Sequence, residues 1–82
     1  MLTSEQVRAA RALLRIEQRE LAERAGVSPE TIKRIERTPG PIAAHSATVD
    51  KVQKALEAAG VAFIAENGGG AGVRLKDASP GR

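Results

Sequence analysis

The amino-acid sequence predicts a mainly α-helical domain of four helices that ends in a C-terminal β-hairpin. Three observations support this fold class. Apolar residues recur every three or four positions from Val7 to Ala59, which is the period of one helix face. Glycine and proline interrupt this pattern at Gly26, at 38–41 and at Gly60. After Gly60 the period changes to the alternation that is typical of β-strands.

The first helix is expected to start after Thr3, an N-cap with Gln6 as its capping-box partner, and to run to about Arg15. The second helix is expected over about 18–25. Its N-cap would be Glu17, which is not among the residues that cap best, so capping is expected to be weaker here.

The third helix is expected to begin after Ser28, with Pro29 at its first position, where the missing N–H costs nothing. It should end near Arg37, because the segment 38–41 contains two prolines and a glycine. The fourth helix follows a long loop and is closed by Gly60. Its apolar face consists of Val49, Val52, Leu56 and Ala59. Its N-cap is expected to be Ser46 or Thr48.

The hairpin is expected from strands at 61–65 and 73–76 around a glycine-rich turn at 67–72, with a disordered tail from Asp77. A two-stranded hairpin is marginal alone, so it must pack on its own helices or pair with a second chain. Pairing is favoured, because Phe63, Val73 and Leu75 are apolar and little core is left for them to cover in so small a domain. The residues expected to make this dimer contact are Phe63, Ile64, Val73 and Leu75.

Composition excludes several classes of protein. The chain of 82 residues has no cysteine, which excludes disulfides and thiolate metal sites. It has no run of 18 apolar residues and no signal peptide, so we expect no membrane span and a cytoplasmic, nucleoid-associated location. His45 lies in a loop with no second histidine and no cysteine nearby, so we expect a helix-entry residue and not a ligand or base. No helix follows the glycine run, so we expect no metal, no cofactor and no catalytic residue.

The segment 18–36, QRELAERAGVSPETIKRIE, has the features of a helix-turn-helix. Ala22 is small where a second helix must cross closely, and Gly26 can adopt the positive φ that ends a helix. Ile32 and Ile35 lie three residues apart on one face. This unit places its second helix in the major groove of DNA. The alternative is a helical hairpin that only fills a core.

These residues resemble the Cro/C1-type helix-turn-helix proteins, a class of bacterial and phage repressors. The resemblance covers about 7–61, roughly two thirds of the chain. Its most specific part is Gln18, Glu20-Leu21-Ala22, Ala25-Gly26-Val27-Ser28, Thr31-Ile32 and Ile35-Glu36.

The resemblance implies roles for residues of the third helix. Pro29, Glu30 and Arg34 match positions that commonly reach base edges. Pro29 offers apolar contact to a thymine methyl, Glu30 can accept from cytosine N4, and Arg34 can bind guanine O6 and N7. Alternatively, Arg34 is a solvated surface charge, and Glu30 stabilises the helix dipole.

Other residues are expected to hold the DNA backbone or the fold. The candidates for phosphate contacts are Gln18, Arg19, Thr31, Lys33 and Arg37. Between Lys33 and Arg37 there are three cations and one anion, which suits a polyanionic partner. The resemblance also implies a partly buried ion pair between Arg11 and Glu36, with a structural role.

The sequence therefore predicts a non-enzymatic, sequence-specific transcriptional regulator that binds double-stranded DNA as a homodimer on a two-fold-symmetric operator. Its expected parts are a DNA-binding domain at 1–60, a dimerisation hairpin at 61–76 and a tail at 77–82. One alternative is an antitoxin or anti-regulator whose main partner is a second regulatory protein. Another is an interaction module that no longer binds DNA.

Overall fold

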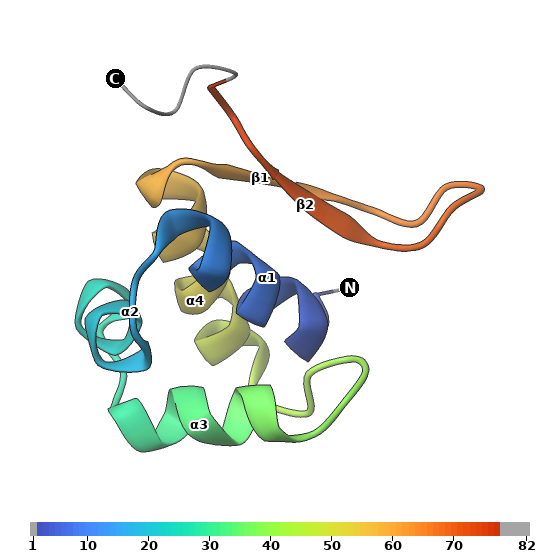
Figure 1. Ribbon diagram of the computed structural model, residues 1–82. Coiled ribbons are helices and arrows are strands. Elements are labelled where there is room, and N and C mark those ends of the chain that lie inside the picture. Colours follow the sequence, from blue (N-terminus) through green and yellow to red (C-terminus); the bar gives the residue numbers. More distant parts are fainter. Residues whose placement is uncertain (1, 78–82) are drawn as a thin grey trace.

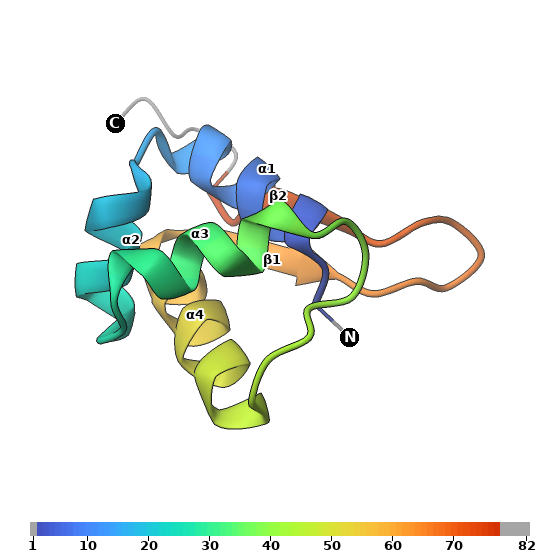
Figure 2. The same cartoon turned by 90° about the horizontal axis from the view of Figure 1, so that it is seen from below.

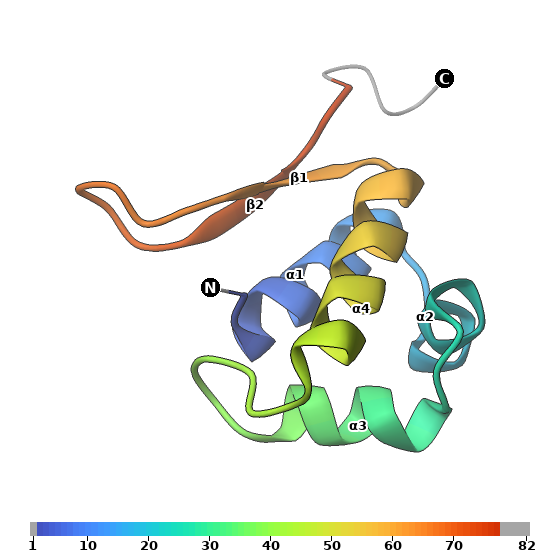
Figure 3. The same cartoon turned by 180° about the vertical axis from the view of Figure 1, so that it is seen from behind.

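The computed structural model describes residues 2–77 and confirms the predicted fold class. The elements are α1 (Ser4–Leu14), α2 (Gln18–Ala25), α3 (Pro29–Arg37), α4 (Ser46–Ala59), β1 (Val61–Ile64) and β2 (Gly72–Leu75). Figure 1 shows α3 along one side of the molecule and the β-hairpin along the opposite side, with α1 and α4 between them. The same arrangement is visible from behind in Figure 3. Of the tail predicted at 77–82, residues 78–82 lie outside the described residues.

The core is aliphatic and draws on every helix. Its buried members are Leu2, Val7, Ala10, Leu21, Ala22, Ala25, Ile32, Ile35, Val52, Leu56 and Val61. Full burial of an aliphatic side chain the size of valine or leucine contributes about 1.5–3 kcal/mol. A few such residues therefore hold the helices of this short chain together.

The helix ends follow the expected capping, with one exception. Thr3 Oγ1 accepts from the Gln6 N–H at 3.1 Å, and Gln6 Oε1 accepts from the Thr3 N–H at 3.0 Å. Ser28 Oγ accepts from the Thr31 N–H at 3.1 Å, whereas Glu17 makes no side-chain capping bond. The expected N-cap of α4 was wrong. The N-cap is His45, because its carbonyl already accepts the first helical bond, from Val49 at 3.0 Å.

The long loop between α3 and α4 is tied to the N-terminal segment. The Ser4 N–H donates to the Gly40 carbonyl at 2.9 Å, and the Ile42 N–H donates to the Leu2 carbonyl at 3.2 Å. The Glu5 carboxylate accepts from the Gly40 N–H at 3.1 Å. Backbone hydrogen bonds, from its own N–H and from Gly40, lower the pKa of Glu5. These contacts hold the first half of the loop against the N-terminal segment.

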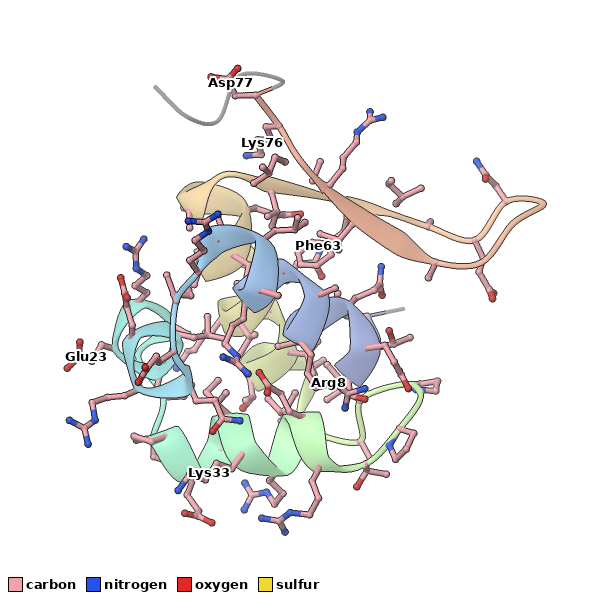
Figure 4. The ribbon with its side chains drawn as sticks, viewed as in Figure 1. Arg8, Glu23, Lys33, Phe63, Lys76 and Asp77 are labelled. Carbon is pink, nitrogen blue, oxygen red and sulfur yellow. The ribbon has the colours of Figure 1, made fainter. Side chains whose placement is uncertain are left out.

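The hairpin packs on the helices of its own chain. Its register pairs Val61 with Leu75 and Phe63 with Val73, so these four side chains share one face. Val61 is fully buried, and the other three pack against the core. In Figure 4 the labelled Phe63 lies between the hairpin and the helices. The expectation that little core remained for Phe63, Val73 and Leu75 was therefore wrong. It failed because α1 and α4 offer apolar surface to the hairpin.

The opposite face of the hairpin carries Ile64, which is 38% exposed. Where the two strands diverge, Gln6 Nε2 donates to the Gly72 carbonyl at 2.8 Å and to the Ile64 carbonyl at 3.5 Å. Gln6 therefore joins the start of α1 to both strands.

Arg15 provides a test of the backbone geometry. It ends α1 with φ 58°, a left-handed conformation that costs an L-residue other than glycine about 1–2 kcal/mol. We expect Arg15→Gly to be more stable than Arg15→Ala by about 1 kcal/mol in urea unfolding, because glycine relieves this strain. The alanine variant controls for the lost charge. Equal stability of the two variants would show that the position carries no strain.

Candidate nucleic-acid interface

The connection between α2 and α3 has the geometry of a helix-turn-helix. Gly26 ends α2 with φ 73°. A Cβ at this position would meet no atom within 4 Å, so the backbone angle, and not lack of space, calls for glycine. The next N–H, of Val27, donates back to the Ala22 carbonyl at 3.0 Å. Ala22 is 1% exposed, and its small side chain lets α3 cross close to α2.

Helix α3 has a buried face and an exposed face. Ile32, Ile35 and Glu36 are buried against the rest of the domain. The predicted contact residues that lie on the exposed face are Pro29, Glu30, Lys33, Arg34 and Arg37. Thr31 is half-buried, and its hydroxyl lies 2.9 Å from Ser28 Oγ. Figure 2 shows α3 on the outside of the molecule, and in Figure 4 the labelled Lys33 side chain points away from it.

The structure brings Arg11 and Glu36 together as a bidentate ion pair. Arg11 Nε lies 2.7 Å from Glu36 Oε2, and Arg11 Nη2 lies 2.9 Å from Oε1. Gln18 Nε2 also donates to Oε1, at 2.9 Å. The hydrogen bonds to Glu36 raise the pKa of Arg11 above its ordinary value. One carboxylate thus joins α1, α2 and α3.

This pair changes the charge that α3 presents to solvent. Glu36 is the one anion in the segment from Lys33 to Arg37, and it is 5% exposed. The ion pairs found among residues 2–77 leave Lys33, Arg34 and Arg37 unpaired. The second half of the exposed face therefore carries positive charge only.

Two hollows border this face. The first, of about 680 Å³, lies where α2 and α3 begin and is lined by Arg11, Glu17, Gln18, Arg19, Pro29 and Lys33. We call it the α2–α3 groove. The second, of about 470 Å³, lies between α3 and the following loop, and Thr31, Arg34 and His45 are among its lining residues. The sequence did not predict that Glu17 and His45 line these two hollows. The only signal was that Glu17 is an unusual N-cap.

Other classes of site find little support in the described part of the chain. Residues 2–77 hold no group of three histidine, cysteine or acidic side chains that could bind a metal ion. None of the helices in that range has the length and apolar character needed to cross a membrane.

Comparison with known families decides the class of the molecule. The family model described as Helix-turn-helix matches residues 7–63. This chain belongs to the Cro/C1-type helix-turn-helix family. It is therefore a DNA-binding regulator by family, and such proteins are not typically enzymes. The match contains Arg11, Glu36 and the whole of α3, but not β2. A search of curated proteins gives no match.

The buried ion pair leads to a stability prediction. We expect Glu36→Gln to lower the free energy of unfolding by about 2–3 kcal/mol, because it leaves Arg11 without its charged partner. The control is Glu20→Gln, which breaks the exposed pair of Glu20 with Arg24 and should cost less than about 1 kcal/mol. Urea unfolding measures both. Equal losses would show that the buried pair adds no more stability than an exposed one.

Proposed function

We propose that this chain is a sequence-specific transcriptional regulator, a repressor or autoregulator, that binds a two-fold-symmetric operator as a homodimer. The observation that supports this best is the exposed, positively charged face of α3. Its orientation is held by the carboxylate of Glu36, which contacts both α1 and α2. A rigidly oriented helix whose exposed second half carries only cations, Lys33, Arg34 and Arg37, suits the major groove of DNA.

In this proposal three residues of α3 read base edges. Arg34 forms a bidentate pair with guanine, Glu30 accepts from cytosine N4, and Pro29 contacts a thymine methyl. All three are exposed, and Arg34 also lines the hollow toward the next loop. Glu30 and Arg34 are four residues apart and lie on the same side of the helix, and Pro29 is at its first position, so all three can reach the same short run of base pairs.

A second set of residues holds the phosphate backbone. This set is Gln18, Arg19, Thr31, Lys33 and Arg37. Gln18, Arg19 and Lys33 line the α2–α3 groove. The Gln18 side-chain amide donates to Glu36, so its remaining N–H bond and its backbone N–H are left for phosphate. These contacts give affinity and register without base preference.

The hairpin at 61–76 is proposed as the dimerisation element. It lies on the opposite side from α3 (Figures 1 and 3). Two hairpins can pair edge to edge about a two-fold axis perpendicular to the sheet that they form. Both α3 helices then lie on the same side of this sheet, where they can contact one duplex. Stacking of the outer faces would direct the two helices to opposite sides. We therefore propose pairing through a strand edge. Ile64 would lie beside the seam, and Phe63, Val73 and Leu75 would support it from the core side.

Base reading is tested with Arg34→Ala. The operator is first mapped by footprinting on the DNA upstream of the gene. We expect this variant to lose about 1–3 kcal/mol of binding free energy on that site and to relax base preference at one position. Arg24→Ala is the control, since it removes the same charge from an exposed pair on α2. Equal losses on operator and random DNA would instead make Arg34 a phosphate contact.

Dimerisation is tested by equilibrium sedimentation. We expect a particle of twice 8.6 kDa and weaker association for Ile64→Glu, because a charge beside the seam must be desolvated on pairing. Leu13→Glu is the matched control, since Leu13 is exposed to a similar extent, 41%, but lies on α1. A wild-type protein that stays monomeric when bound to its operator would refute the homodimer.

A further inference from the structure

Glu17 places a negative charge in the α2–α3 groove. It is exposed, it precedes α2, and it lines the groove together with Arg11, Arg19 and Lys33. The ion pairs found among residues 2–77 do not include it. Its charge also contributes, after that of Glu36, to the raised pKa of Arg11. The carboxylate therefore attracts Arg11 without forming an ion pair with it.

The position of Glu17 is unfavourable for binding an anion next to it. The first N–H groups of a helix have no partner within the helix, and they attract negative charge. In α2 the first helical bond runs from the Leu21 N–H to the Glu17 carbonyl, and the Glu17 side chain caps none of the earlier N–H groups. A phosphate that approached these groups would come close to the Glu17 carboxylate and would be repelled by it.

We propose that Glu17 is a repulsive residue that limits how tightly the α2–α3 groove holds the DNA phosphate backbone. The proposal rests on the proposed DNA-binding function and assigns a regulating role to one residue of that surface. Because the repulsion acts on phosphate and not on bases, it lowers affinity for every duplex. Non-specific binding comes almost wholly from phosphate contacts, so this restraint reduces the time spent on random DNA.

The test compares Glu17→Gln with Glu23→Gln on a random-sequence duplex by fluorescence anisotropy over a range of salt concentrations. The two variants change the net charge equally. Glu23 is exposed on α2, does not line the groove, and points away from the molecule in Figure 4. It is therefore a matched control for long-range electrostatics, which salt screens over about 10 Å at 0.1 M.

We expect Glu17→Gln to bind about five- to tenfold more tightly than wild type and Glu23→Gln to change affinity less than about twofold. The plot of log K against log salt should steepen by about 0.9 for Glu17→Gln, which corresponds to one additional phosphate. Glu17→Ser is a second variant that also supplies a good N-cap, so it tests affinity in a fold at least as stable.

Equal affinities of Glu17→Gln and Glu23→Gln, or weaker binding by both Glu17 variants, would overturn the proposal. Weaker binding would mean that Glu17 makes a favourable contact with DNA. A wild-type protein that binds neither random DNA nor its own upstream region at low salt would instead refute the proposed function.

Discussion

The buried carboxylate of Glu36 is the interaction on which the arrangement of this domain depends. A charge removed from water costs several kcal/mol unless partners surround it. Here Arg11 donates to both carboxylate oxygens and Gln18 donates to Oε1. Arg8 Nη1 donates to the Glu36 backbone carbonyl at 2.7 Å. These partners come from α1 and α2, whereas Glu36 lies near the end of α3. The orientation of α3 is therefore set by directional hydrogen bonds as well as by the apolar contacts of Ile32 and Ile35.

The same interaction separates charge across α3. The anion of its second half is turned inward, and the cations are turned outward. Burial of Glu36 thus stabilises the position of the helix and leaves a surface suited to phosphate and guanine. The α2–α3 groove modifies this surface, since Glu17 reintroduces one negative charge beside Arg19 and Lys33. Glu36 sets the orientation of α3, and Glu17 alters the charge of the groove beside it. Because the two residues are different, the orientation and the charge can change independently.

Much of the fold could be predicted from the sequence, because local signals determine it. The Thr3–Gln6 capping box, Ser28 before Pro29 and the glycine at 26 place helix ends within a residue or two. Contacts between residues far apart in the sequence could not be predicted from such local signals. Arg11 and Glu36 are 25 residues apart, and only the family resemblance implied their pairing. The N-cap of α4 was missed because several polar residues adjoin one another there. The docking of Phe63 was missed because it depends on surfaces of α1 and α4 that no local pattern reveals.

The ties between the N-terminal segment and the loop after α3 constrain the length of that loop. Gly40 and Ile42 bond to Ser4 and Leu2 in a short antiparallel register. One inserted residue between these two contacts would shift one partner out of reach and expose backbone groups that are now paired. Insertions in related chains are therefore easier to accommodate after Ile42, ahead of α4, than between Gly40 and Ile42.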